Sequence, residues 1–215
     1  MKKEILTDNG IYEYEKVELY DGRKILDPDV ARKNLLDFKK VCDKHKIRYG
    51  LMFGTLLGAI REGAFIVHDE DTDVFVLVED RDKVLNALFD FEELGFKVAR
   101  FNKRKDLLSL IRDDDYIDMY FYKKFLNKRK IYDNMVDAKY LENRESVNFL
   151  GEDFPVPGNP KELLKVIYGE DWETPIKDRK PTNYSYNKIV KKYIKENVTF
   201  LYKIYKFLKV TIIGK

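Results

Sequence analysis

A run of acids that leads directly into an apolar strand is the feature of this 215-residue sequence that most limits its fold. The stretch VHDEDTDVFV, residues 67–76, places four acidic side chains within five positions and then continues with valine and phenylalanine. Asp71 and Asp73 are two positions apart, so on a β-strand both carboxylates point to the same face. Because neighbouring carboxylates repel each other, the sequence predicts that a divalent cation or a shared proton neutralises this pair.

The chain offers oxygen ligands for such a cation. It contains one cysteine, Cys42, and two histidines, which are too few for an ordinary zinc site, and it has no second cysteine for an intramolecular disulfide. Carboxylate ligands favour Mg²⁺ or Mn²⁺. A third acid in an apolar frame, Asp118 in YIDMYFY, lies in a later predicted strand that can pair beside the first. We therefore expect a metal site made of Asp71, Asp73 and Asp118.

A glycine-threonine turn upstream completes the expected site. In IRYGLMFGTLLGAIREG we predict a strand over 49–53, a turn at Gly54 and Thr55, and a short helix over 56–61. The N-terminus of such a helix presents unpaired N–H groups to an anion. Together with a metal on the acids, this arrangement suits the transfer of a phosphorus group, with the N–H groups near Thr55 and the guanidinium of Arg61 holding phosphoryl oxygens.

Each of these signals also has an ordinary structural explanation. An acidic run before a strand is more often a solvated loop, and a Gly-Thr pair is a common turn. What favours catalysis is the order of the elements: turn, helix, paired acids, and a later strand acid. Asp69 remains as a general base or an additional ligand, and the sequence does not separate these roles. His68 is the weaker candidate for a base, because a histidine at a strand start is more often structural.

The remaining pattern predicts an α+β domain in which helices flank a mixed sheet. Helices are expected over 28–46, 81–94 and 160–169, and strands over 71–78, 96–101, 106–112 and 116–122. The later strands follow one another closely and are expected to pair as hairpins. Residues 123–150 are rich in lysine and give no clear pattern. We expect one catalytic domain over 1–181 and a basic helical tail over 182–215.

The motifs resemble those of the LicD/fukutin family of phosphotransferases, whose fold is similar to that of nucleotidyltransferases. FGTLLGAIREGAFIVHDEDTDVFV looks like the core motif of that family, and IYGEDWETP is similar to its Tyr-Gly-x-x-Trp-x-x-Pro signature. The resemblance covers roughly residues 30–181. His68 stands where a tryptophan is usual and is expected to alter the fit of donor or acceptor. Glu70 replaces the middle acid of the usual triple and is expected to face outward.

The resemblance implies a reaction and its partners. The family moves a phospho-alcohol such as phosphocholine from a CDP-linked donor to a sugar hydroxyl of a cell-surface glycan, free or lipid-linked. Matched position by position, the donor would contact Gly54, Thr55 and Arg61, and the metal and catalysis would depend on Asp69, Asp71, Asp73 and Asp118. Tyr168, Gly169 and Trp172 are candidates for a surface that stacks on the donor base or a sugar, although from the sequence alone packing of Trp172 in the core ranks first.

Two other functions remain open at this stage. A nucleotidyltransferase that adds NMP from an NTP would use the same acids. A non-enzymatic, membrane-associated factor in glycan assembly would leave the site idle, although an idle site gives no physical reason to keep repelling charges together.

The C-terminal residues form a separate basic element. Residues 180–215 contain nine lysines and one glutamate, and their apolar run VTFLYKIYKFLKVTII is too short and too charged to span a bilayer. An amphipathic segment of this kind can lie on a membrane surface, or it can pack on the core or on a second copy of the chain. A basic segment alone does not indicate nucleic-acid binding. In the absence of a secretion signal we expect a cytoplasmic protein, with a possible site of action at the inner face of the membrane.

Overall fold

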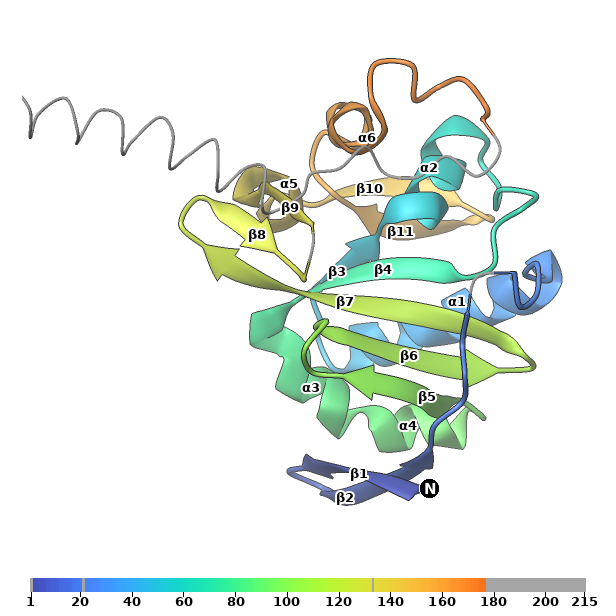
Figure 1. Ribbon diagram of the computed structural model, residues 1–215, viewed down its shortest axis with the longest axis vertical. Coiled ribbons are helices and arrows are strands. Elements are labelled where there is room, and N and C mark those ends of the chain that lie inside the picture. The colour runs from blue at the N-terminus through green and yellow to red at the C-terminus, as the bar shows by residue number, and fades with distance from the viewer. Residues whose placement is uncertain (1, 21, 133, 177–215) are drawn as a thin grey trace, which may run out of the picture.

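The computed structural model describes residues 2–20, 22–132 and 134–176 (Figure 1). Its centre is a mixed sheet in the order β3-β4-β7-β6-β5, which β8 and β9 continue from the far end of β7. The strands are β3 (Tyr49–Leu51), β4 (Thr72–Leu77), β5 (Lys97–Asn102), β6 (Leu107–Arg112), β7 (Asp115–Phe125), β8 (Lys128–Lys130) and β9 (Met135–Asp137). The predicted tail over 182–215 lies outside the described residues.

Strand directions confirm the mixed sheet. β4 and β7 are parallel, whereas β3, β6 and β5 pair antiparallel with their neighbours. The antiparallel run β5-β6-β7 is the series of hairpins that the sequence predicts. The single parallel pair sets β4 beside β7, and this pairing brings together acids that are 45 residues apart in the sequence.

Three helices, α1 (Pro28–Lys44), α3 (Arg81–Asn86) and α4 (Leu88–Glu93), lie on one side of the sheet (Figure 1). α1 begins as its sequence predicts: the Asp27 side chain accepts hydrogen bonds from the N–H groups of Asp29 and Val30, and Pro28 occupies the first turn. Its apolar stripe is buried, and the residues are Ala31, Leu35, Phe38, Val41 and Cys42. The burial of this stripe attaches the helix to the sheet.

The expected helix over 81–94 is divided into α3 and α4, with a short 3₁₀ turn at Val78–Asp80 before them. The division falls at Ala87, directly after Asn86. The carbonyl of Asn86 accepts a hydrogen bond from the side chain of Asn9, and its own side chain bonds to Asp8. The helix therefore breaks where an N-terminal segment distant in sequence supplies competing partners, which no local pattern reveals.

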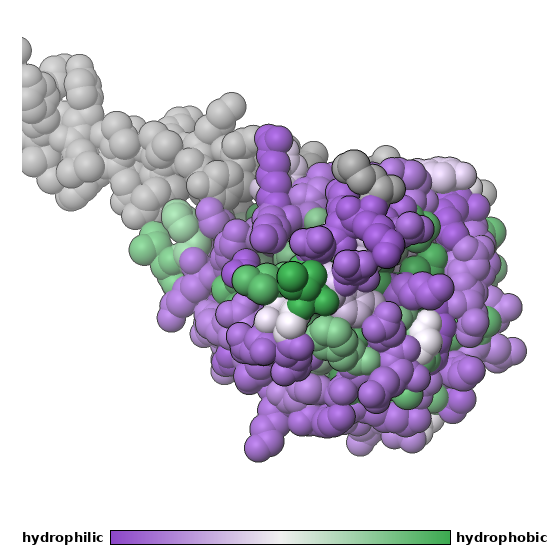
Figure 2. All heavy atoms as spheres, turned by 90° about the horizontal axis from the view of Figure 1, so that it is seen from below, coloured by the Kyte–Doolittle hydropathy of each residue, from purple (hydrophilic) through white to green (hydrophobic). Residues whose placement is uncertain are grey.

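That N-terminal segment is a hairpin of β1 (Lys2–Thr7) and β2 (Gly10–Glu15), which the sequence analysis did not predict. Its inner side is buried through Ile5, Tyr12 and Tyr14. The surface seen from below, where the hairpin lies, is mostly hydrophilic with a small apolar area (Figure 2). On the outer side of the hairpin, Leu6 and Ile11 face each other across the strands and are exposed.

The remaining elements gather at the β3 end of the sheet (Figure 1). They are α2 (Phe53–Arg61), α5 (Ala138–Glu142), β10 (Glu145–Phe149), β11 (Glu152–Val156) and α6 (Pro160–Tyr168). The α6 helix begins at Pro160 as expected, but the side chain of Asn159 forms no capping bond; instead the Asn159 N–H donates to Glu145. Within the described residues, no helix is long and apolar enough to cross a membrane.

Candidate active site

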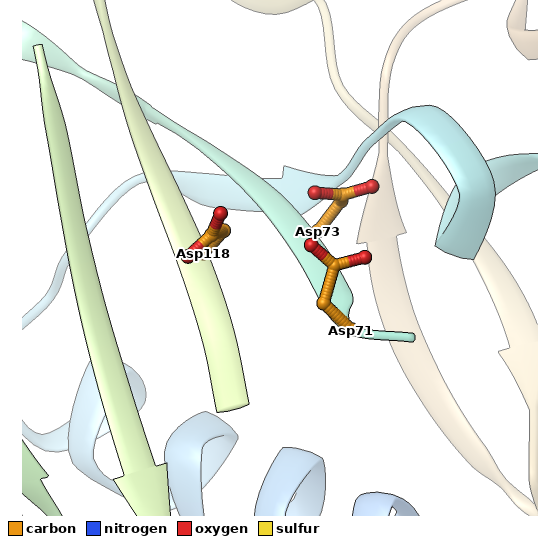
Figure 3. A group of neighbouring side chains, drawn as sticks. All are labelled: Asp71, Asp73 and Asp118. Carbon is orange, nitrogen blue, oxygen red and sulfur yellow. The ribbon is translucent and has the colours of Figure 1, made fainter. Parts of the chain in front are cut away.

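Three aspartates meet where β4 lies beside β7 (Figure 3). Asp73 on β4 is the register partner of Asp118 on β7, and Asp71 lies one residue before β4 begins. One carboxylate oxygen from each aspartate lies within 4.8 Å of the others. The structure thus brings together the three residues that the sequence predicts as metal ligands.

Burial makes this group costly in its charged form. Desolvation raises the pKa of Asp71 and of Asp73 well above the usual value for aspartate, and the charges of the neighbouring acids raise both further. Asp73 Oδ1 is buried and has no hydrogen-bond partner among the described residues. A divalent cation would supply the missing positive charge, and hard carboxylate oxygens are the ligands that Mg²⁺ and Mn²⁺ prefer. The donor set therefore fits such an ion.

Asp118 has a supporting network that the sequence analysis missed. Arg100 Nη2 donates to Asp118 Oδ2 at 2.7 Å, and the Ser109 hydroxyl donates to Asp118 Oδ1. Burial raises the pKa of Asp118, while the charge of Arg100 acts in the opposite direction. The three residues lie side by side because the register pairs Arg100 with Ser109 and Ser109 with Asp118. Their equal spacing of nine residues along the chain is the only sequence signal, and it has meaning only once the hairpin register is known.

The start of α2 differs from the prediction. The helix begins at Phe53, so Gly54 and Thr55 lie in its first turn instead of in a turn before it. The reason is that β3 ends early: the Met52 N–H bonds to the Asp73 carbonyl, and the Met52 carbonyl already accepts from Leu56. The Thr55 hydroxyl accepts a hydrogen bond of 2.8 Å from the Asp73 N–H. These contacts tie the helix to β4, while a role toward phosphate stays a prediction.

Gly54 lies against the fourth acid of the run. A Cβ added at Gly54 would collide with the Asp69 carboxylate, so the close approach of these residues requires glycine. Asp69 Oδ2 is buried without a hydrogen-bond partner among the described residues. Burial is the main cause that raises the pKa of Asp69 from 3.8 to about 6. A carboxylate with this pKa can accept a proton near neutral pH.

Two of the predicted substrate contacts are engaged elsewhere. Arg61 donates to Glu62 through Nε at 3.0 Å and to the Trp172 carbonyl through Nη1 at 3.4 Å, and its side chain is 11% exposed. Trp172 is part of the hydrophobic core, in agreement with core packing, which the sequence analysis gave as the alternative to stacking on a substrate. A role of either residue toward the donor stays a prediction.

The other residues of the acidic run have separate positions. His68 is exposed in the turn before Asp69. Glu70, expected to face outward, is half-buried, because its carboxylate accepts the Gly22 N–H at 2.8 and 2.7 Å. Glu70 therefore fastens the segment that precedes α1.

Three tyrosines surround the acids, and two of them, Tyr116 and Tyr120, were missed by the sequence analysis. Burial raises the pKa of Tyr116, Tyr120 and Tyr168, and the charges of the site aspartates add to the effect in each case. Tyr116 and Tyr120 lie two residues on either side of Asp118, so strand alternation alone places them on its face. The sequence carried this signal, whereas the position of Tyr168 depends on how α6 packs.

The raised pKa of Asp69 leads to a stability prediction. Since its folded pKa lies above the unfolded value, ionised Asp69 destabilises the fold, progressively from about pH 4 and fully above pH 6. We expect Asp69→Asn to raise the unfolding free energy by about 2 kcal/mol at pH 8 and to change it little at pH 4. Urea denaturation in EDTA at both pH values measures this. A variant that is no more stable than the wild type at pH 8 would contradict it.

Residues 46–159 match the protein-family model described as LicD/FKTN/FKRP, nucleotidyltransferase domain. This range is more than half of the chain and contains all three aspartates of the group. An uncharacterised protein of Rickettsia typhi is 30% identical over 112 residues, which are 45% of this chain and 36% of that relative. The lipopolysaccharide cholinephosphotransferase LicD of Haemophilus influenzae is 40% identical over 57 residues, 26% of this chain and 22% of that relative. The chain thus matches about a third or less of the length of these relatives.

Solved structures give weaker similarities. The lincosamide antibiotic adenylyltransferase LnuA, in a lincomycin-bound crystal structure, is 15% identical with a TM-score of 0.45, and the match covers 61% of this chain and 83% of that one. The antibiotic-resistance factor ANT(2'')-Ia is 15% identical with a TM-score of 0.48, covering 87% and 97% of the two chains. At these scores the fold assignment rests on the family match and on the strand topology.

Proposed function

The chain belongs to the LicD/FKTN/FKRP family of nucleotidyltransferase domains, and from this premise we propose that it transfers a phospho-alcohol from a CDP-linked donor to a sugar hydroxyl. The observation that carries the proposal is the group of Asp71, Asp73 and Asp118, whose oxygens lie within 4.8 Å of one another. Phosphocholine is the first choice of transferred group, supported by the similarity to Haemophilus LicD. The proposed acceptor is a cell-surface glycan, free or lipid-linked.

The three aspartates would hold Mg²⁺ or Mn²⁺, which when bound neutralises charge on the phosphoryl oxygens. Asp69 is the proposed general base, because its unpaired Oδ2 and its pKa of about 6 suit proton transfer near neutral pH. In the transfer, the acceptor oxygen forms a bond to the phosphorus that carries the alcohol. The bond from that phosphorus to the oxygen of CMP breaks, CMP leaves, and the acceptor proton passes to Asp69.

The bound positions of the substrates follow from the same elements. The donor phosphates would lie at the N-terminal turn of α2, near Gly54 and Thr55, where a helix favours anions. Arg61, His68 and Trp172 are further proposed contacts of donor or acceptor. In this proposal the protein is cytoplasmic, and a lipid-linked acceptor would bring it to the inner face of the membrane, where the basic residues 182–215 would favour anionic lipid. The alternative proposal is that residues 182–215 join copies of the chain into an oligomer.

A donor screen by thermal shift tests the proposal. With Mg²⁺, we expect saturating CDP-choline to raise the melting temperature by about 5 °C or more, because ligand binding at 100 times Kd stabilises by about 2.7 kcal/mol. CDP-glycerol and CDP-ribitol test the other phospho-alcohols, and CTP and ATP test NMP transfer. A shift with ATP and none with any CDP-alcohol would favour nucleotidyl transfer. No shift with any nucleotide would favour a non-enzymatic role.

A further inference from the structure

Arg100 is a fixed positive charge at the edge of the three-aspartate group. Its Nη2 donates to Asp118 Oδ2 at 2.7 Å and its Nε donates to Ser109 Oγ at 2.8 Å. Asp118 is almost fully buried, and the Arg100 side chain is 27% exposed. These two hydrogen bonds fix the position of the positively charged guanidinium beside Asp118.

The charges of the group have a simple balance. The three aspartates supply three negative charges when they are ionised. In the part of the chain that the structure describes, Arg100 is the one cationic side chain that forms an ion pair with any of them. One divalent cation together with Arg100 therefore neutralises the three ligands, and the nearby carboxylate of Asp69 adds one further negative charge. A second divalent cation would give the whole group a net positive charge in a buried site.

The geometry of Asp118 leads to the same conclusion. Its Oδ2 accepts from Arg100 and its Oδ1 accepts from the Ser109 hydroxyl, so both oxygens already have a donor. A second cation on the side of Asp118 that faces Arg100 would have to displace the guanidinium. No comparable side chain blocks Asp73, whose Oδ1 has no partner within the described residues.

We propose that Arg100 takes the place of a second cation, so that in the absence of donor the site binds a single divalent ion. This inference rests on the proposed function only for the identity of the three metal ligands. It assigns to Arg100 a positioning and charge-balancing role, which acts on the reaction through Asp118.

The test is a titration with Mn²⁺ in which the electron paramagnetic resonance signal of the free ion measures how much metal remains unbound. Wild-type protein is expected to bind one Mn²⁺ per chain. Arg100→Gln, which removes the charge, is expected to bind the first Mn²⁺ at least about tenfold more tightly, since the cation that repels the metal is lost. Arg100→Lys retains the charge and is expected to stay within about threefold of the wild type.

Ser109→Ala separates charge from orientation, because it removes a hydrogen bond to Asp118 without changing the charge. Its Mn²⁺ affinity is expected to change by less than about fivefold. Two Mn²⁺ ions per wild-type chain would overturn the inference. An Arg100→Gln variant whose affinity for Mn²⁺ is unchanged, or is weakened to the level of Ser109→Ala, would also overturn it. If Arg100→Gln does not fold, a wild-type stoichiometry of two Mn²⁺ ions per chain would still overturn the inference.

The two proposals fail in different ways. Wild-type protein that binds one Mn²⁺ but releases no CMP from any CDP-linked donor would refute the proposed function and leave the role of Arg100 intact. Two Mn²⁺ ions together with normal CMP release would refute the role of Arg100 alone.

Discussion

Asp73→Asn is expected to lower turnover of the CDP-linked donor by about 10³-fold or more, because the loss of a metal ligand removes several kcal/mol of transition-state stabilisation. The same change removes a buried charge, and with it the desolvation and the repulsion that raise the pKa of Asp73. In EDTA at pH 8 the variant should therefore melt above the wild type, while Mg²⁺ no longer raises its melting temperature. An Asp73→Asn variant that is inactive but melts above the wild type has lost the metal site and kept its fold.

Glu70→Gln is the matched control for this change. Glu70 belongs to the same acidic run, but its carboxylate accepts from Gly22 and is not part of the three-aspartate group. We expect Glu70→Gln to retain activity within about threefold, with a loss of stability of about 1 kcal/mol from the weakened hydrogen bonds. Folded Asp73→Asn protein that turns over at the rate of the Glu70→Gln control would contradict the metal assignment.

Gly54→Ala is expected to lower activity by about 100-fold with little loss of stability. The added Cβ collides with the Asp69 carboxylate, which must move, and a shift of about 1 Å at a reacting group can cost about 100-fold in rate. Alanine also favours the helix over glycine by about 1 kcal/mol, which offsets the strain. Steady-state kinetics and urea denaturation on the same preparation measure both effects.

Gly58→Ala on the same helix should have the opposite effects. Its Cβ would collide with the backbone carbonyl of Ala64, which cannot rotate away, so overpacking should cost about 1–3 kcal/mol of stability. No site aspartate is among the nearest atoms, and the activity per folded molecule should be close to that of the wild type. If Gly54→Ala keeps full activity, Asp69 has no role in the transfer.

The grouping of Asp71 with Asp73 was predictable because strand periodicity is a short-range property. Two aspartates at positions i and i+2 share a face on any strand, and the apolar residues after Asp73 identify the strand. The contribution of Asp118 required one further inference, that its strand pairs beside the strand of Asp73. The pairing of Asp73 with Asp118 in the structure confirms it.

The side-chain contacts that hold the site residues in place were not predictable from strand periodicity. The contact of Arg100 with Asp118 depends on the register of two hairpins, and the β5-β6 register shifts between Val98 and Arg100. A shift of one residue would turn the guanidinium to the opposite face. The contact of Arg61 with Trp172 likewise depends on how the segment after α6 packs on α2. Such long-range packing leaves no periodic signal in the chain.

The products released from CDP-choline test the central claim most directly. Purified protein is incubated with CDP-choline and Mg²⁺, with water as the slow acceptor, and the nucleotides are separated by chromatography. The proposed function predicts release of CMP that requires Mg²⁺ and that Asp73→Asn abolishes. Absence of CMP from every CDP-linked donor, together with release of pyrophosphate from CTP or ATP, would show that the same aspartates serve nucleotidyl transfer and would contradict it.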